Sequence, residues 1–544
     1  MTMSNKNFVV LSTVLLASIM QSSAWAQAGN LSRGTGALDN NITGIHNSAF
    51  GENALEDNTT GSANSAFGQG ALQENVHGAQ NTAIGQIALN QNTSGYQNVA
   101  VGASSLRWNT TGFYNVAVGQ QALRENTTGT RNTSVGWHAL LENTTGNYNS
   151  ALGAMALNSN TTGYANVAVG HGALTSNTEG QGNTALGLLA LARNITGESN
   201  VAVGSALFSN TTGNNNVGVG AGTLYGNTTG YANVGIGNSS LAENTTGFEN
   251  TGIGRKALNN NTTAWRNTGV GHSSMNKNTT GRNNTALGWS SLYANITGHN
   301  NTAIGWQALR RNRDGAQNTA LGLRAGFSNR SGRSNIFIGG YAGYSETGSN
   351  KLYIANNKTT PAIYAEMSST AANTKLGFGT TSVGSADAIK VWNGASLSKA
   401  GVWTNASSRT LKDNIRTLTT DEALDTLTAL EPVRYVYKNS PEEEYVGFIA
   451  EDVPELVAVN DRKSLAAMDI VAVLTKVAKE QQSELDAMTI EQQSQAEQLQ
   501  EKDSEIAVLQ QTVEELSAQQ RQLMIQLSIL MQKLESQNLD VSQL

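Results

Sequence analysis

The sequence predicts a mainly β protein in which a long β-solenoid of 17-residue repeats is followed by a small α+β domain and a C-terminal coiled coil. Three observations predict this fold class: a glycine that recurs at a fixed period, a composition that changes along the chain, and an apolar heptad pattern near the C-terminus. Of the 57 glycines among the 544 residues, 51 lie within residues 27–350, and all four prolines come later. This contrast marks the first domain boundary.

Residues 1–26 have the pattern of a secretory signal peptide. Lys6 precedes an apolar run from Phe8 to Met20, which is too short to span a bilayer comfortably. Small residues follow at Ala24 and Ala26, so we expect cleavage after Ala26 and a chain that is secreted or displayed at the cell surface. No later stretch reaches about 18 apolar residues, so the mature chain is not expected to span a membrane.

Cysteine content and charge exclude several classes of function. The chain has no cysteine, which excludes a disulfide framework, a thiolate metal site and a cysteine nucleophile. The net charge of −6 gives no electrostatic footprint for nucleic acid, so no nucleic-acid partner is expected. Residues 469–536 carry 12 acidic and five basic side chains, which leaves the remainder of the chain nearly neutral. The charge is therefore assigned to this one segment.

The repeat occupies residues 27–350 and comprises 18 units. Glycines in phase run from Gly34 to Gly339, with one 16-residue step after Gly204. The unit reads G-x-x-A-L-x-x-N-T-T-G-x-x-N-[VT]-A-[VI]. We call this recurring first residue the phase glycine. In the tripeptide before it, side chains alternate in character with a period of two, which is typical of a short strand. The Asn-Thr-Thr-Gly segment is a turn in which the glycine is expected to take a positive φ.

Two positions of the repeat predict ladders of stacked side chains. Both asparagines are present in all 18 units, which favours Asn ladders between coils. Leucine follows the alanine in 16 of the 18 units, with Met275 and Gly326 as the exceptions, which predicts an apolar ladder inside. One unit cannot bury a core alone, so the units must stack, and so thin a core favours three chains packing together. At ~4.8 Å per rung the predicted rod is on the order of 85 Å long.

The N-[ST]-A-[IVF]-G pattern of these repeats resembles the head repeats of trimeric autotransporter adhesins, which form left-handed β-rolls. The resemblance implies a trimeric β-roll with an adhesive role. The period of this chain departs from the shorter one usual in that family. No outer-membrane β-barrel anchor follows the repeats, so that family's secretion route is not implied.

Acidic side chains of adjacent coils offer an alternative role for the solenoid. Asp57 with Glu74, and Glu125 with Glu142, would be the carboxylates of a glycosidase or of a site for a hard cation. The acids are sparse and the coils are uniform, which favours a solvated edge instead. The six histidines all lie in the repeats without ligand spacing, so they are expected at the surface, and neither a metal nor a cofactor is expected.

Residues 351–400 have the pattern of short strands and turns, a connector, and residues 401–468 follow as a separate domain. Its most informative residues are Ser407, Leu411, Lys412, Asn414 and Ile415, then Leu427, Leu430, Pro432, Val433, Tyr435, Tyr437 and Lys438, and finally Gly447, Phe448, Ile449, Ala450, Glu451, Asp452 and Val453. In these residues the domain resembles the peptidase S74 family, the intramolecular chaperone of endosialidases and other phage tailspikes. The resemblance covers about residues 407–480 and is specific as a set.

In that family a Ser–Lys pair cuts the backbone just before the serine once the chaperone has trimerised. The resemblance therefore implies Ser407 as the nucleophile, Lys412 as the base and the Ala406–Ser407 bond as the cleavage site. The family commonly has Asp after the serine, and Ser408 stands there in this chain. This chemistry would be at most a single-turnover self-cleavage. The other interpretation is a serine that caps a helix, followed by an exposed lysine.

The chemistry of the residues agrees with a lysine base. No histidine follows residue 299 and the chain has no cysteine, so a Ser–His–Asp or Cys–His site in this region would need another region to fold back. The ordinary pKa of lysine, about 10.4, must fall toward 7–8 before the amine can accept a hydroxyl proton, and burial has this effect. Assembly of a trimer would supply the burial.

Residues 469–538 are expected to form a coiled coil, with a short tail at 539–544. Glutamate and glutamine fill the outside, and four polar residues, Gln492, Gln495, Lys502 and Gln520, interrupt the apolar seam. The number of strands, three, is implied by the family. The apolar positions are Val471, Ala478, Leu485, Leu499, Ile506, Val513, Leu527 and Leu534, with Leu474, Met488, Leu509, Leu516, Leu523 and Leu530 as the second row.

Together these features predict an exported, homotrimeric fibre or adhesin-like surface protein whose C-terminal domain drives trimer assembly and releases itself by cleavage before Ser407. A surface glycan or a host receptor would be its external partner. Two alternatives stay open: a tailspike-like protein that binds or degrades a polysaccharide with carboxylates on the solenoid, and a prophage tail fibre, which the signal peptide disfavours.

Overall fold

The computed structural model describes residues 29–370, 373–459 and 461–537. The expected signal peptide at 1–26 and the tail at 539–544 lie outside the described residues. The chain divides into two compact units, residues 1–407 and 408–544. Among the described residues, no helix has both the length and the apolar character that a bilayer crossing requires.

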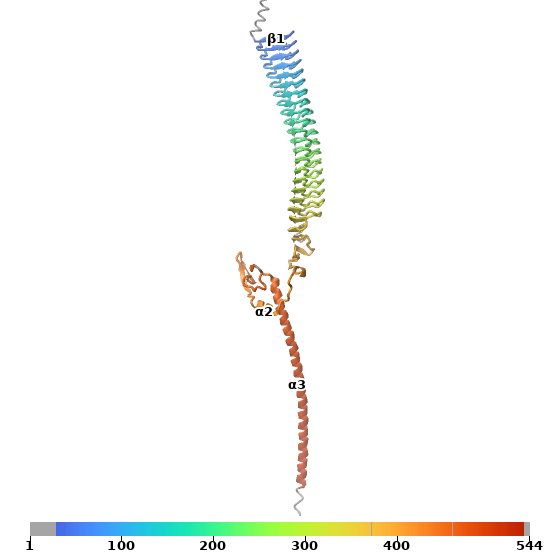
Figure 1. Cartoon of the computed structure of the whole chain (residues 1–544), viewed down its shortest axis with the longest axis vertical. Helices are drawn as coiled ribbons and strands as arrows, with labels where there is room; N and C mark the ends of the chain where they lie inside the picture. The colour runs from blue at the N-terminus through green and yellow to red at the C-terminus, as the bar shows by residue number, and fades with distance from the viewer. Residues whose placement is uncertain (1–28, 371–372, 460, 538–544) are drawn as a thin grey trace, which may run out of the picture. The chain divides into compact units, whose positions relative to one another are not determined.

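The first unit begins with a β-solenoid of stacked rungs, which confirms the predicted fold class (Figure 1). Each rung contributes one short strand, and successive strands pair in parallel. The strands are β1 (Leu31–Arg33), β2 (Ser48–Phe50), β3 (Ser65–Phe67), β4 (Thr82–Ile84), β5 (Val99–Val101), β6 (Val116–Val118), β7 (Thr133–Val135), β8 (Ser150–Leu152), β9 (Val167–Val169), β10 (Thr184–Leu186), β11 (Val201–Val203), β12 (Val217–Val219), β13 (Val234–Ile236), β14 (Thr251–Ile253), β15 (Thr268–Val270), β16 (Thr285–Leu287), β17 (Thr302–Ile304), β18 (Thr319–Leu321) and β19 (Ile336–Ile338).

The pairing register follows the sequence period. Val116 of β6 pairs with Thr133 of β7, which holds the same position in the next repeat. The 16-residue step leaves this register intact, because Val201 still pairs with Val217. The missing residue is absorbed at the corner after the strand, where the φ of Gly204 falls to 83°, below the values of the other phase glycines. Rung length can therefore vary at this corner without disturbing the sheet.

The core is a ladder of leucine and alanine side chains inside a single chain. Leu106 and Ala117 are fully buried, and their counterparts in neighbouring rungs are buried in the same way, which confirms the predicted apolar ladder. These side chains are already closed off from solvent in one chain. A thin core therefore does not by itself require three chains, and this part of the sequence argument does not hold.

Each rung is joined to the next by a buried asparagine, the second of the repeat. The Asn216 side chain accepts hydrogen bonds from the backbone N–H and the Nδ2 of Asn233, at 3.0 and 3.1 Å. Its own Nδ2 donates to Asn200 Oδ1 at 3.1 Å and to the Gly230 carbonyl at 2.8 Å. Every hydrogen-bonding group of this side chain is thus satisfied by the rungs on either side. The predicted Asn ladder is confirmed, and it lies in the interior.

The turn asparagine forms a second ladder, and the turn glycine serves a different purpose from the one predicted. Asn227 Nδ2 donates to Asn210 Oδ1 at 2.7 Å and to the Gly230 carbonyl at 3.0 Å. Positive φ belongs to the phase glycine, 125° at Gly220, and not to the turn glycine, so that expectation was wrong. A Cβ on Gly230 would instead clash with the Gly247 carbonyl and the Asn227 side chain. The turn needs glycine because the rungs approach closely there.

Left-handed backbone also occurs at residues that the sequence did not single out, including the core leucine. In one rung Ser104, Leu106 and Tyr114 have φ values of 57°, 49° and 59°. This conformation costs a non-glycine residue about 1–2 kcal/mol. Complete burial of a leucine side chain contributes about 1.5–3 kcal/mol, and Leu106 N–H also donates to the Ala122 carbonyl at 3.0 Å. Burial of the leucine side chain therefore offsets the strain at the leucine itself.

The leucine ladder ends at Phe337, the central residue of β19. This position holds alanine or another small residue in the other rungs, whereas the Phe337 ring is fully buried. The ladder position on either side is glycine, at Gly326 and Gly343, and a Cβ on either residue would clash with the ring. One large side chain thus fills the space of two missing leucine side chains, which explains the exception at Gly326.

Below Phe337 the sheet changes from parallel to antiparallel. The strand β20 still pairs in parallel with β19, but β21 pairs antiparallel with both β20 and β22. β23 then runs parallel to β22, and β24 and β25 add antiparallel pairs. The bounds are β20 (Lys351–Ile354), β21 (Ile363–Glu366), β22 (Lys375–Phe378), β23 (Asp387–Val391), β24 (Ser396–Ser398) and β25 (Trp403–Thr404).

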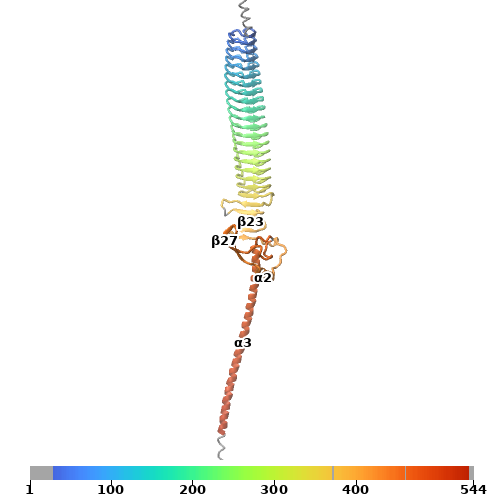
Figure 2. The same ribbon diagram turned by 90° about the vertical axis from the view of Figure 1, so that its left-hand side faces the viewer.

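The second unit is a small α+β domain followed by one long helix, labelled α3 in Figure 2. Ala423, Val457 and Val473 are buried together in its core. Helix α2 begins with a reciprocal capping box between Thr419 and Glu422. The predicted helical C-terminal segment is confirmed, whereas its pairing into a coiled coil stays a prediction. The elements are η2 (Arg409–Leu411), α2 (Thr420–Thr428), β26 (Val433–Tyr437), β27 (Ser440–Gly447) and α3 (Ala467–Gln537).

The buried ladder predicts a large difference between two adjacent asparagines. Asn216→Asp replaces an amide donor by a buried carboxylate oxygen facing the Gly230 carbonyl, so local opening should become easier by about 3 kcal/mol or more. Asn215→Asp is the control, because Asn215 is exposed and Asp tolerates its φ of 57°. Amide hydrogen exchange of residues 200–233 measures both effects. Equal protection in the two variants would contradict the ladder's role.

Candidate functional site

The predicted nucleophile and base bracket a single turn of 3₁₀ helix. Ser407 lies immediately before Ser408, the N-cap of η2, and Lys412 is the residue at its C-terminal end. The Ser408 Oγ accepts the backbone N–H of Thr410 at 3.3 Å, and Lys412 N–H donates to the Arg409 carbonyl at 3.2 Å. Ser408 therefore performs a capping role that Asp also performs well, which gives a structural reason for the substitution in the family pattern.

Ser407 and Lys412 belong to different compact units. Ser407 is the last residue of the first unit, and Lys412 lies near the start of the second. Both side chains are exposed, and Ala406 is half-buried. The single chain therefore does not supply the burial that a lysine base requires.

The second unit leaves several large apolar side chains exposed. Leu411 of η2 and Ile415, which follows η2, are 54 and 55% exposed, and Val446 of β27 is 71% exposed. Arg462 braces the segment before α3, because its guanidinium donates to the carbonyl oxygens of Glu451 and Val453 at 2.9 and 2.6 Å. The domain is thus stabilised by hydrogen bonds of its own, while several of its apolar side chains are exposed to solvent.

The comparison with protein families finds one match, which covers residues 407–460 and is to the family described as chaperone of endosialidase. The resemblance of this segment to the S74 family is confirmed. The matched region begins at Ser407, the residue that the resemblance implies as the nucleophile. No curated protein and no solved structure matches the chain. For the solenoid repeats, which we call the shaft, only their own geometry indicates a role.

Three of the four acids proposed for the solenoid have ordinary local partners. Asp57 Oδ1 accepts Asn40 Nδ2 at 3.0 Å, Glu74 Oε1 accepts Gln91 Nε2 at 3.4 Å, and Glu125 pairs with its neighbour Arg124. Within the part of the chain that the structure describes, no three histidine, aspartate or glutamate side chains gather as they would around a metal ion. The geometry therefore provides no support for a hydrolytic or cation site on the solenoid.

Three of the histidines are not the surface residues that the sequence suggested. His138, His272 and His299 are half-buried. The His138 ring stacks on Trp137 with 3.7 Å between ring centroids, and burial, followed by the charge of Arg124, lowers its pKa. These histidines therefore pack along the rungs rather than forming a ligand set.

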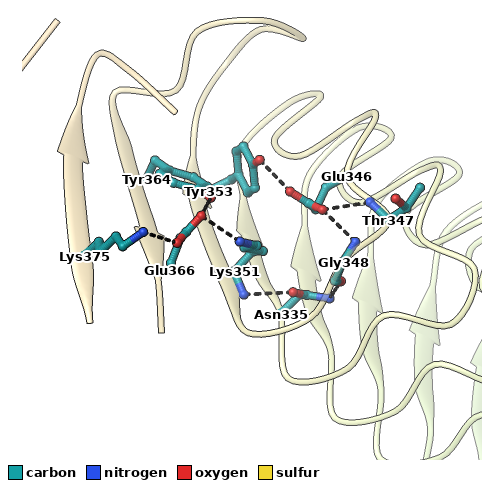
Figure 3. Close-up of polar contacts among 9 residues, drawn as sticks. All are labelled: Asn335, Glu346, Thr347, Gly348, Lys351, Tyr353, Tyr364, Glu366 and Lys375. Atoms are coloured by element: carbon teal, nitrogen blue, oxygen red, sulfur yellow. Dashed lines mark hydrogen bonds and ion pairs between the residues drawn. The ribbon is translucent and has the colours of Figure 1, made fainter. Parts of the chain in front are cut away.

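A charged cluster that the sequence did not predict holds the connector beneath the solenoid. Figure 3 shows Glu366 of β21 between Lys351 of β20 and Lys375 of β22, with nitrogen–oxygen distances of 3.0 and 3.1 Å. The Tyr364 hydroxyl also donates to Glu366, at 3.0 Å. One carboxylate thus joins three neighbouring strands.

The same cluster shifts the pKa of its members. The hydrogen bond from Lys351, followed by those from Lys375 and Tyr364, lowers the pKa of Glu366 to about 2 against the opposing effect of burial. Burial and a hydrogen bond of 2.7 Å to Glu346 raise the pKa of Tyr353 well above its usual range. No sequence motif marks these residues, because they become neighbours only when the sheet turns antiparallel. The arrangement is structural, because the carboxylate ties β20, β21 and β22 together.

The Glu366 cluster predicts acid sensitivity confined to the connector. The pKa of Glu366 is about 2 in the folded chain and near 4.5 without its partners, so its stabilising effect is complete above about pH 4.5 and is lost as the pH falls from 4.5 toward 2. Hydrogen exchange of β20 to β22, corrected for intrinsic rates at pH 5.5 and 2.5, measures the loss. The Glu366→Gln variant should flatten this dependence, and an unchanged profile would refute the assignment.

Proposed function

We propose that this protein is an exported, homotrimeric surface fibre, in which the solenoid is the shaft and the C-terminal domain assembles the trimer and then cuts the chain before Ser407. The family match at residues 407–460 carries the proposal, because chaperone domains of this kind are tied to the assembly of trimeric fibres. The solenoid fold fits the fibre role. Export rests on the pattern of residues 1–26.

The long helix supports self-association because its apolar seam has no cover within the chain. Leu485, Leu499 and Leu523 are 54, 63 and 65% exposed, although leucine side chains at such spacing normally pack against a partner helix. Polar residues interrupt the seam at Gln492 and Lys502, which can fix the register of the partner helices. A bundle of three such helices would bury the whole row.

The shaft adds a second uncovered row. The third residue of most strands points away from the core and is often a large apolar side chain, which remains exposed on the single chain. A continuous exposed apolar row is typical of an interface. The residues are Phe67, Ile84, Val118, Leu152, Leu186, Ile236, Ile253, Leu287, Ile304 and Ile338.

A dedicated assembly domain solves a registration problem that the shaft creates. Successive rungs are so similar that two shafts displaced by one rung would present nearly the same contacts, and such a displacement costs little locally. Contacts that are distant in sequence also form slowly. The chaperone domain does not repeat, and polar residues such as Gln492 and Lys502 interrupt the heptads of the helix, so together they can set one alignment before the shafts join.

The self-cleavage would follow from burial of the lysine in the trimer. Neutral Lys412 takes the proton from Ser407 Oγ, which attacks the Ala406 carbonyl carbon. The peptide C–N bond then breaks, the Ser407 nitrogen leaves as an amine, and an ester joins Ala406 to Ser407 Oγ. Water hydrolyses this ester to give residues 27–406 and 407–544. Because Lys412 is exposed in the single chain, cleavage would report on correct assembly.

The two adjacent serines give a matched test of this chemistry. We expect the wild type to yield two fragments on denaturing electrophoresis, Ser407→Ala to remain intact, and Lys412→Met to be cut at least about 100-fold more slowly, since it lacks the base. Ser408→Ala loses only the cap of η2 and should still be cut. A wild type that stays at full length while its measured mass is that of a folded trimer would leave the domain a role in assembly alone.

The helix offers a second matched pair. Leu509 lies on the apolar seam and Val508 lies beside it, and the two side chains are 63 and 65% exposed. Leu509→Glu would place charges inside the proposed bundle, so trimer and cleavage should both decrease, by tenfold or more in the amount of trimer at micromolar concentration. Val508→Glu should change neither. Light scattering gives the mass, and a trimer that survives Leu509→Glu but not Val508→Glu would place the seam elsewhere.

A further inference from the structure

The near-neutral charge of the shaft conceals two segments of opposite sign. Residues 29–249 carry 11 acidic and five basic side chains, a net charge of −6. Residues 250–345 carry 11 basic side chains and one acid, Asp314, a net charge of +10. The assignment of all excess charge to the C-terminal helix was therefore wrong. The basic side chains are Arg255, Lys256, Arg266, Lys277, Arg282, Arg310, Arg311, Arg313, Arg324, Arg330 and Arg333.

Most of these cations have no ion pair within the described part of the chain. The exception is Arg266, which pairs with Glu249 at the N-terminal boundary of the basic segment. Four of the arginines lie in or beside the turn and are exposed, and we call them the basic turn face: Arg282, Arg313, Arg330 and Arg333.

Stacking of the rungs aligns part of this face. Arg313 and Arg330 occupy the same position of successive rungs, and Arg313 N–H donates to the Arg330 carbonyl at 2.8 Å. Their side chains therefore start about 5 Å apart and point to the same face. Arg333 follows the turn glycine of the lower rung. The result is a short column of guanidinium groups beside the axis of the shaft.

A polar groove begins beside Arg333. It has a volume of about 650 Å³ and is lined by Gln317, Thr319, Ser334, Ile336, Asn350, Met367, Ser368 and Ser369. Gln317 and Ser334 occupy equivalent positions of two rungs, and the Ser334 hydroxyl bonds to Gln317 Oε1 at 3.3 Å. Amide and hydroxyl groups make up most of this lining. Such groups suit a ligand rich in hydroxyls.

The Trp265 ring, which lies beside Arg282, is already used by the protein. Trp265 stacks on Phe248 with 5.7 Å between ring centroids and an interplanar angle of 1°. The Arg282 guanidinium carbon also lies 5.4 Å from the centre of the Trp265 ring. Binding of single-stranded nucleic acid depends on free ring faces for base stacking, which this ring does not offer. The face instead presents charge and hydrogen-bond donors.

We propose that the basic turn face and the adjoining groove bind an acidic polysaccharide, with the arginines contacting its carboxylate or sulfate groups and the groove contacting its hydroxyls. An extended polymer can contact Arg313, Arg330 and Arg333 and continue into the groove beside them. Guanidinium groups bind planar carboxylates and sulfates through paired hydrogen bonds, which gives the arginines their role. This binding is independent of cleavage before Ser407.

The test uses the full-length protein with four probes of similar length: polygalacturonate, neutral dextran, polyglutamate and oligo-deoxythymidine. We expect polygalacturonate to bind most tightly, with an affinity that falls as salt rises. Arg330→Gln with Arg333→Gln should weaken this binding on the order of tenfold. The control removes two arginines from the acidic segment, Arg131→Gln with Arg193→Gln, and should leave the affinity unchanged.

A second variant tests the groove. Gln317→Gly with Ser334→Gly removes the polar side chains while keeping the left-handed backbone, where φ is 59° and 56°. It should reduce the preference for polygalacturonate over polyglutamate. Several outcomes would overturn the proposal: no binding of polygalacturonate, equal wild-type binding of polyglutamate, tighter binding of oligo-deoxythymidine, or an equal loss in the control pair.

Discussion

The buried asparagine ladder is the interaction on which the rest of the shaft depends. A rung has only one short strand, so its turns and corners are joined to the next rung by backbone hydrogen bonds outside the strands, such as that from Leu106 N–H to the Ala122 carbonyl. The asparagine side chain adds a continuous chain of bonds through the interior, because each amide accepts from the next rung and donates to the rung before and to a turn carbonyl. The strands, the leucine ladder and the close approach of the turn glycines all require the spacing that this ladder sets.

The repetitive features could be predicted from the sequence because repetition reveals side chains that meet their own copies. The strand tripeptides, the leucine ladder and the asparagine ladders were of this kind. Backbone conformation was harder to predict from the sequence. Nothing about a leucine side chain such as that of Leu106 indicates a left-handed backbone. The positive φ expected for the glycine of the turn belongs to the phase glycine instead. The burial of the leucine and the close packing at the turn glycine determine these conformations, and both arise only when the rungs are stacked.

Features that occur once were missed for a related reason. Glu366 meets Lys351 and Lys375 only because the sheet reverses direction, and no spacing in the sequence announces that reversal. The two charged segments of the shaft have opposite net charges, which nearly cancel with the rest of the chain in the total from which the sequence argument started. At the C-terminal site the family pattern identified Ser407 and Lys412, and the structure adds the helical turn η2 that lies between them.

The shortened rung has a consequence for how such a protein changes over generations. Since each rung bonds only to its neighbours and tolerates a lost residue at its corner, whole rungs can be gained or lost by unequal recombination between nearly identical stretches of the gene. Each event would alter the reach of the shaft by ~4.8 Å and leave both ends unchanged. Selection can then adjust the length of the shaft one rung at a time.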